Sequence, residues 1–221
     1  MTMLTLAIEA STYAGSVAVI RDHVVVNERE AAMRGEREER LMPAVAEALR
    51  DAGVPPAGID RIVCGAGPGS FTSLRIAGAI AKGLALAESV PLYPVSSLLL
   101  IVAGARPALV PGRHVAVLDA MRGDVFAALI TITDGEIVRE LPTAIMPRAA
   151  VAAYARDHAA HVVGPGEAID VQPHARGAAV LGTLVSWPAV ADLATWEPDY
   201  GRVAEAQARW EAAHGRALTS Q

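Results

Sequence analysis

The chain has 221 residues, of which 52% are hydrophobic and 19% charged, and its formal net charge is −5. This length and apolar content allow a large core, so neither disulfides nor a metal is needed for folding. The negative charge and the lack of a lysine or arginine cluster argue against a large phosphate-binding surface. If the protein serves RNA, we expect a partner to hold the RNA.

The single cysteine, Cys64, lies in the apolar run Ile62-Val63-Cys64 and is expected to be a buried thiol in a reducing compartment. The apolar run over residues 5–8 is too short for a signal peptide. No stretch of the sequence reaches the ~20 apolar residues that span a bilayer. The sequence therefore favours a cytosolic protein without membrane attachment.

An internal repeat sets the predicted architecture, because the segment 6–30 resembles the segment 115–140. Each copy is typical of three strands in a meander, with β-branched residues through the second and third strands. An acidic residue, Glu9 or Asp119, ends the first strand of each copy.

Each meander is followed by a helix, predicted over 38–51 and 148–157, and then by a strand that runs into glycines. Two such halves facing each other are similar to the actin-like, sugar-kinase and heat-shock-ATPase (ASKHA) superfamily, whose core is RNase H-like. We therefore predict a duplicated α/β fold with two βββαβα halves, over 1–105 and 106–221, the second with a C-terminal tail. The alternative is two unrelated α/β units with coincident patterns.

The turn after the first strand receives a phosphate in that superfamily, so Glu9, Ser11 and Thr12 are candidate nucleotide-binding residues. Asp119 has the equivalent place in the second half. Ser11 and Thr12 are equally typical of ordinary turns. The carboxylate of Glu9 also reaches one methylene further than that of an aspartate, which catalytic geometry rarely tolerates.

The run from Gly65 to Arg75 predicts a sharp corner between a strand and a helix. Its candidate anion-binding residues are Gly67, Gly69 and Ser70. The run lacks the Lys-Ser/Thr ending of a P-loop and the spacing of the dinucleotide fingerprint. A ligand site and a purely structural corner both stay open.

No metal site and no catalytic residue are predicted. Only His158 and His161 have local spacing among the histidines, and solvated histidines after a helix end are the commoner explanation. There is no Gly-x-Ser-x-Gly elbow, and Cys64 lies inside a strand rather than at an exposed turn.

Two helices carry more apolar surface than one sheet face can cover. The helix near 40–52 has apolar residues at three- and four-residue steps, and the helix over 71–87 is apolar and small on nearly every side. A second apolar face is covered either by the same chain or by another subunit. We favour a subunit interface. Its predicted residues are Leu41, Val45, Leu49, Leu74, Arg75, Ala77, Gly78 and Ala81.

The segment 67–75, Gly-Pro-Gly-Ser-Phe-Thr-Ser-Leu-Arg, resembles the signature Gly-Pro-Gly-Ser-Phe-Thr-Gly-Leu/Val-Arg of the TsaB family, also called YeaZ, of tRNA threonylcarbamoyladenosine biosynthesis. It departs from the signature at Ser73. Further similarity to the family lies at 6–12, where Glu9 stands for the family's aspartate, and at 39–43, 119–126 and 197–202. The resemblance spans the chain and is weakest over 171–193.

The resemblance implies the actin-like fold and a non-catalytic scaffold or activating role for TsaD, the paralogous transferase that carries a metal. It implies pairing with TsaD, or with a second copy when TsaD is absent, through the two helices after the first meander. It also implies the ATPase TsaE as a further partner and tRNA bound only through the complex. The His-x-x-x-His metal pair of TsaD has no counterpart at 37–41.

No resident cofactor is expected, while ATP or ADP at the boundary between subunits stays open. The alternative function is an independent small-molecule kinase or ATPase of the same superfamily. It would hold its nucleotide among Glu9, Ser11, Asp119 and the loop 67–69. A metallopeptidase is discounted because no ligand set is present in the sequence.

Overall fold

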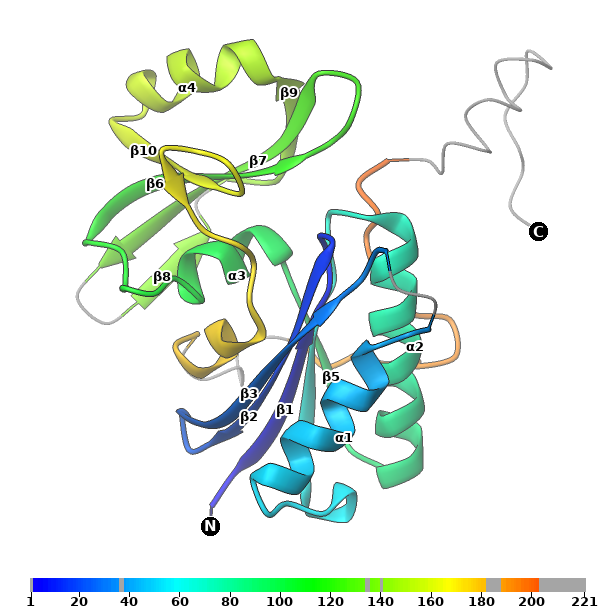
Figure 1. The fold of residues 1–221 in the computed structure, drawn as a ribbon. Helices are drawn as coiled ribbons and strands as arrows, with labels where there is room; N and C mark the ends of the chain where they lie inside the picture. Colours follow the sequence, from blue (N-terminus) through cyan, green and yellow to red (C-terminus); the bar gives the residue numbers. More distant parts are fainter. Residues whose placement is uncertain (1, 36–37, 134–135, 140, 182–187, 203–221) are drawn as a thin grey trace, which may run out of the picture.

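The computed structural model describes residues 2–35, 38–133, 136–139, 141–181 and 188–202, and these form two β-sheets with helices on their faces (Figure 1). The elements up to the middle of the chain are β1 (Leu4–Glu9), β2 (Ala14–Arg21), β3 (Val24–Ala32), α1 (Leu41–Asp51), η1 (Pro56–Gly58), β4 (Arg61–Gly65), α2 (Phe71–Glu88), β5 (Leu92–Val95) and α3 (Ser97–Ala103). The later elements are β6 (Gly112–Asp119), β7 (Asp124–Thr133), β8 (Glu136–Arg139), β9 (Ala144–Pro147), η2 (Arg148–Ala150), α4 (Val151–Asp157), β10 (Ala160–Gly164), β11 (Ile169–Asp170) and η3 (Ala175–Ala179).

The two sheets repeat one topology. The first has the strand order β3-β2-β1-β4-β5 and the second the order β8-β7-β6-β10-β11. In each sheet the meander strands pair antiparallel and the strand after the helix pairs parallel with the first strand. The first hairpin turns at Asp22 and His23, both with positive φ, as the right-handed twist of a tight hairpin requires. The predicted duplication is confirmed.

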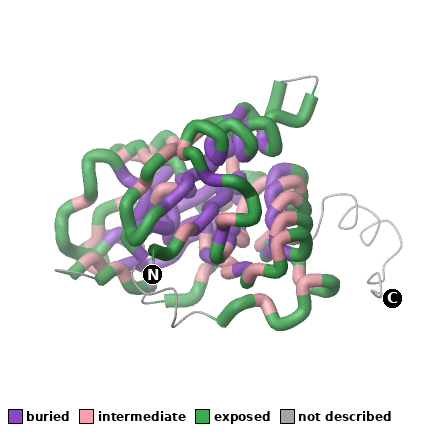
Figure 2. The backbone as a smooth tube through the Cα atoms, turned by 90° about the horizontal axis from the view of Figure 1, so that it is seen from below, coloured by how far each residue is buried: buried purple, intermediate pink, exposed green. Residues whose placement is uncertain are grey.

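The helices divide the protein into layers. All seven residues of α3 are buried, and α3 lies in a core between the two sheets. The opposite face of the first sheet packs against α1 and α2, and the opposite face of the second packs against α4 (Figure 1). Figure 2 shows buried backbone in the middle of these layers and exposed backbone in the connecting turns. The carboxyl ends of β1 and β4 meet at one edge of the first sheet because the two strands are parallel.

The first helix begins later than predicted, at Leu41 rather than at residue 38. The carboxylate of Glu39 accepts hydrogen bonds from the N–H groups of Leu41 and Met42, which satisfies two donors that the first turn leaves unpaired. Gly53, with a φ of 65°, follows the end of the helix as predicted.

The second half differs from the prediction in detail. The helix predicted over 148–157 is divided into η2 and α4, and β9 is an additional strand that pairs with β7. In the described part of the chain, the segment after β10 holds β11 and the short helix η3 in place of a closing α-helix. The proposed division at residue 105 stays a prediction, because α3 shares its core with both sheets. None of the described helices combines the length and the apolarity needed to cross a bilayer.

Candidate functional site

The carboxylate of Glu9 is the centre of a buried cluster at the carboxyl edge of the first sheet. Its Oε1 accepts a hydrogen bond from the Ser11 N–H at 2.5 Å, and its Oε2 accepts one from the Ser97 hydroxyl at 2.9 Å. A Cβ atom at Gly65 would lie 2.7 Å from the Glu9 Cδ and closer still to Oε2. The cluster therefore needs a residue without a side chain at position 65.

Burial raises the pKa of the Glu9 carboxyl above its usual range, and the hydrogen bonds from Ser11 and Ser97 act against that rise. Glu9 is completely buried, so its carboxylate is a structural group of the turn. The turn amide that would receive a phosphate, Ser11 N–H, already donates to this carboxylate. An internal anion thus takes the position that an external anion would use.

Ser97 connects the Glu9 cluster to the glycine loop 65–70. Its hydroxyl accepts a hydrogen bond from the Gly67 N–H at 3.2 Å, and its own N–H donates to the Gly67 carbonyl at 2.8 Å. Sequence reasoning missed this residue. Ser97 lies 88 positions from Glu9, and no motif around it marks the contact.

The structure brings five of the seven candidate nucleotide-binding residues together. The Ser70 N–H donates to the Ser11 carbonyl at 2.7 Å, and a Cβ at Gly69 would lie 2.6 Å from the Ser11 Cβ. The glycine loop therefore packs directly on the turn that follows β1. The five residues are Glu9, Ser11, Gly67, Gly69 and Ser70.

The two other candidates, Thr12 and Asp119, bind backbone N–H groups of local turns, and the Thr12 hydroxyl also donates to the Gln172 side-chain oxygen at 3.4 Å. The Thr12 hydroxyl accepts a hydrogen bond from the Ala14 N–H at 3.2 Å, and the exposed Asp119 accepts one from the Met121 N–H at 2.9 Å. Among the residues that the structure describes, no hydrogen bond links Asp119 with Glu9 or with the glycine loop.

The C-terminal segment 188–202, which we call the strap, covers the glycine loop. The Asp199 N–H donates to the Ala66 carbonyl at 2.7 Å, and a Cβ at Gly67 would lie 3.1 Å from the Asp199 carbonyl carbon. The ring of Tyr200 stacks on Phe71, with 4.5 Å between the ring centroids. The loop predicted as an anion site is therefore occupied by the protein's own backbone.

The end of the strap also contacts the second half. A Cβ at Gly201 would lie 2.8 Å from the Pro68 Cβ and 2.7 Å from the Phe126 Cζ, so the strap passes between the glycine loop and β7. Arg202 forms an ion pair with Asp124 at the start of β7. The strap thus joins the two halves beside the candidate site.

Seven of the eight predicted interface residues are buried inside the chain, so they do not form an exposed surface, and the interface itself stays a prediction. An amphipathic helix buries its most apolar face on its own sheet first, and both helices do so here. The exception is the exposed Arg75, which stacks on the Phe71 ring at 4.8 Å. The seven buried residues are Leu41, Val45, Leu49, Leu74, Ala77, Gly78 and Ala81.

The outer face of α2 is apolar, and among its residues Ala79, Gly83 and Leu86 are exposed while Ile76 and Ile80 are half-buried against the core. We call this surface the α2 stripe, and it consists of Ile76, Ala79, Ile80, Gly83 and Leu86. Leu86 is 61% exposed, and a Cβ at Gly83 would have no atom within 4 Å. The residues recur at three- and four-residue steps, so they line one side of the helix.

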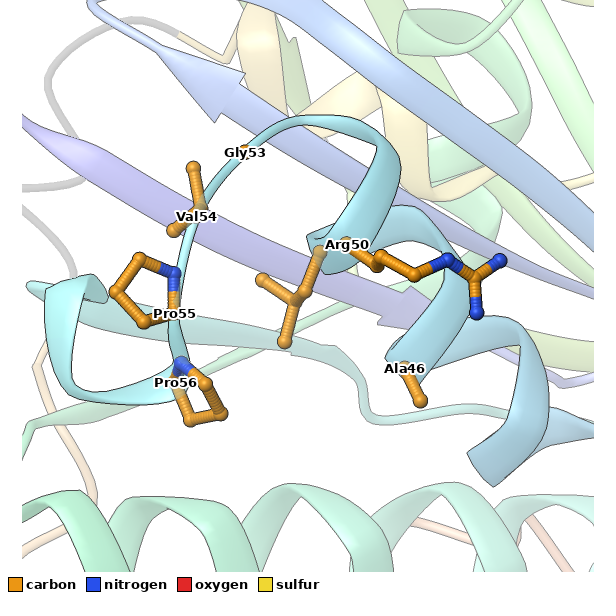
Figure 3. A pocket seen from close by; sticks show the side chains of 7 residues that line it. Ala46, Arg50, Gly53, Val54, Pro55 and Pro56 are labelled. Atoms are coloured by element: carbon orange, nitrogen blue, oxygen red, sulfur yellow. The ribbon is translucent and has the colours of Figure 1, made fainter.

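A hollow of about 380 Å³ lies beside the C-terminal end of α1 (Figure 3). The hollow lies far from the Glu9 cluster, because the loop that lines the hollow precedes β4 and the glycine loop follows β4, at the opposite end of the strand. Its side chains are mostly apolar and do not converge polar groups on one point, as a small-molecule site does. The residues that line it are Ala46, Leu49, Arg50, Gly53, Val54, Pro55 and Pro56.

Within the described ranges, no group of three or more His, Cys, Asp or Glu side chains is placed to hold a metal ion. The Nδ1 of His158 donates a hydrogen bond to the Tyr154 carbonyl at 2.8 Å, and the His161 ring lies against the His114 ring with 5.9 Å between the centroids. Cys64 is buried, and burial raises the pKa of its thiol. The expected absence of a metal stays a prediction.

Comparison with known proteins agrees with this architecture. Residues 30–168 match the family model described as TsaD, tRNA N6-adenosine threonylcarbamoyltransferase. Two solved structures from Pseudomonas aeruginosa, one described as similar to peptidase YeaZ and one as YeaZ, superpose with TM-scores of 0.77 and 0.75. Both are 27% identical, and the matches cover 90% of this chain and 100% and 99% of theirs. The duplicated fold that the repeat predicted is therefore confirmed.

Relatives of known name point to one family. The tRNA threonylcarbamoyladenosine biosynthesis protein TsaB of Bacillus subtilis is 31% identical over 94% of this chain and 98% of its own length. The TsaB of Escherichia coli is 38% identical over 57% of this chain and 54% of its own length. The chain belongs to the TsaB (YeaZ) family of tRNA threonylcarbamoyladenosine biosynthesis proteins.

Proposed function

We propose that the chain is a non-catalytic subunit of tRNA threonylcarbamoyladenosine synthesis that activates a TsaD-type transferase by docking it on the α2 stripe. Family membership supports the pathway. The observation that carries the docking role is the apolar outer face of α2, which combines exposed Leu86 with the small residues Ala79 and Gly83.

The composition of the stripe suits a helix partner. Small residues let a second helix approach closely, and the larger Ile76, Ile80 and Leu86 provide apolar area to bury. The only lysine of the sequence, Lys82, belongs to α2 but donates to carbonyls of the strap instead of adding a charge to the stripe. A partly exposed apolar surface of this kind is typical of a protein interface.

The state of the Glu9 cluster supports a non-catalytic role for this chain. The Glu9 carboxylate is engaged by Ser11 and Ser97, and the glycine loop is engaged by Asp199 of the strap. A kinase or ATPase would need both groups free for a nucleotide and a metal. No observation favours that alternative, so we do not propose it.

We further propose that the same stripe pairs two copies of this chain when the transferase is absent. A TsaE-type ATPase and tRNA would then join only the complex with the transferase. The family resemblance is the support for these partners. The net charge of −5 agrees with tRNA being held by another subunit.

The test replaces Ala79 by glutamate in cells that depend on this chain for the modification. Ala79 is exposed, so the charge should leave the fold intact and only oppose docking. Val138→Glu is the matched control, because Val138 is 48% exposed on β8 in the other sheet. We expect Ala79→Glu to lower threonylcarbamoyladenosine in digested tRNA to the level of a deletion strain, and Val138→Glu to leave it unchanged. Full modification with Ala79→Glu would refute the proposal.

A further inference from the structure

The strap crosses three parts of the molecule in order. It begins beside the first sheet, where the Val190 N–H donates to the carbonyl of Leu92 on β5 at 2.9 Å. Val190, Leu193 and Trp196 are half-buried against the core under α1 and α2. The strap then passes over α2 and reaches the glycine loop and β7.

The contact with α2 depends on two residues of that helix. The Lys82 Nζ donates to the carbonyls of Trp196 at 2.9 Å and Ala194 at 3.2 Å. Pro198 is buried over Gly78, where a Cβ would lie 3.0 Å from the proline Cγ. The absence of a side chain at Gly78 therefore leaves the space that the Pro198 ring fills.

The contacts on either side of Pro198 are close to it along the chain. Trp196, which binds Lys82, precedes it by two residues, and Asp199, which binds Ala66, follows it directly. Pro198 cannot leave the surface of α2 without stretching both hydrogen bonds, because consecutive Cα atoms are only ~3.8 Å apart. Release at one of these points therefore favours release at the others.

Most of the strap is held by half-buried and exposed contacts. Pro198 is the only buried residue in the described segment 188–202, and no helix or strand forms there. A segment with few buried contacts opens locally at a free energy far below that of global unfolding. We propose that residues 190–202 form a latch that closes the two halves over the glycine loop and opens as one unit, releasing the Lys82 ammonium group and uncovering Gly67 together.

The consequence of opening follows from what the latch fills. Gly201 occupies the space between Pro68 of the first half and Phe126 of the second, and Arg202 holds Asp124. When the latch leaves, the glycine loop loses its cover and the two halves lose a direct connection. The latch thus controls access to the junction of the two halves, whatever partner binds elsewhere.

The test weakens one end of the latch and observes the other. Arg202→Gln removes the ion pair with Asp124, and Tyr200→Ala removes the ring contact with Phe71. Three positions report on opening: the amides of Val190 and Asp199 by hydrogen exchange, and the acylation rate of Lys82, which is the only lysine. Glu197→Gln, an exposed change within the same segment, is the matched control.

We expect Tyr200→Ala to accelerate all three reactions by about tenfold, the factor that corresponds to ~1.4 kcal/mol of lost contact free energy. Arg202→Gln should also accelerate all three reactions, by a smaller factor. Glu197→Gln should change none of them. The amide of Leu6, in the buried β1, should keep its protection in every variant, which separates latch opening from global unfolding. Faster exchange at Asp199 with unchanged rates at Val190 and Lys82 would overturn the inference.

Discussion

Replacing Gly65 by alanine tests the Glu9 cluster most sharply. The added Cβ would lie 2.7 Å from the Glu9 Cδ and nearer to Oε2, so the carboxylate must move by about an ångström. The movement breaks the hydrogen bond from Ser97 and bends the one from Ser11. A hydrogen bond to a charged group contributes about 1.5–3 kcal/mol, so the expected loss of unfolding free energy is ~3–5 kcal/mol.

The assay is thermal and urea unfolding followed by circular dichroism. For a chain of this size the loss corresponds to a fall in Tm of about 10 °C. Gly83→Ala is the control, since a Cβ there meets nothing within 4 Å and alanine is the better helix former by ~0.5–1 kcal/mol. That variant should be as stable as the wild type or slightly more stable.

The double variant Gly65→Ala with Glu9→Asp examines the cause of the loss. Aspartate is one methylene shorter and withdraws the carboxylate from the new Cβ, so part of the lost stability should return. A Gly65→Ala variant that loses less than ~1 kcal/mol, or a double variant whose losses simply add, would refute the steric reasoning.

Two predictions concern pH. Because the pKa of Glu9 is raised in the folded state, the contribution of Glu9 to stability is fully present below the ordinary pKa of 4.5. This contribution is lost as the pH rises through the folded-state pKa. The Tm of Glu9→Gln should therefore rise relative to that of the wild type as the pH increases above 4.5, whereas a constant difference would contradict the burial effect. Burial and the nearby Arg176 and Arg106 lower the pKa of His174 from 6.5 to about 3. The NMR signals of His174 should therefore stay those of the neutral ring down to pH 4. The stability of the wild type should fall as the pH drops below 6.5, and this fall should be smaller in His174→Gln. A His174 titration near pH 6.5 would be the contrary result.

Much of the fold followed from local patterns in the sequence. β-Branched residues marked both meanders, and the repeat of 6–30 at 115–140 predicted the shared topology. Helix α3 escaped prediction because its residues 97–103 are apolar without a period, as expected for a helix buried on all sides between two sheets.

The candidate site was predictable in part. The alternative nucleotide site placed Glu9, Ser11 and the glycine loop together, and the parallel pairing of β1 with β4 brings the two turns to one edge of the sheet. Ser97 and Asp199 could not be found, since each reaches the glycine loop from a distant part of the chain through contacts that leave no local pattern.

Seven of the eight predicted interface residues lie on the inner faces of α1 and α2, and the helix pattern reveals the reason only in part. An apolar face reveals that a surface is buried, and it does not reveal by what. In α1 the single apolar face, with Leu41 and Val45, packs on the chain's own sheet. In α2 nearly every face is apolar, so the sequence could not distinguish the inner Leu74 and Ala77 from the outer Ala79 and Leu86.

The dissociation constant of this chain with a TsaD-type transferase from the same organism, measured for the wild type and for Ala79→Glu, tests the central claim most directly. We expect a one-to-one complex that Ala79→Glu weakens by about 100-fold, because burying an unpaired charge in an interface costs ~3 kcal/mol. Val138→Glu should bind as the wild type does. Equal affinity for Ala79→Glu and wild type would contradict docking on the α2 stripe.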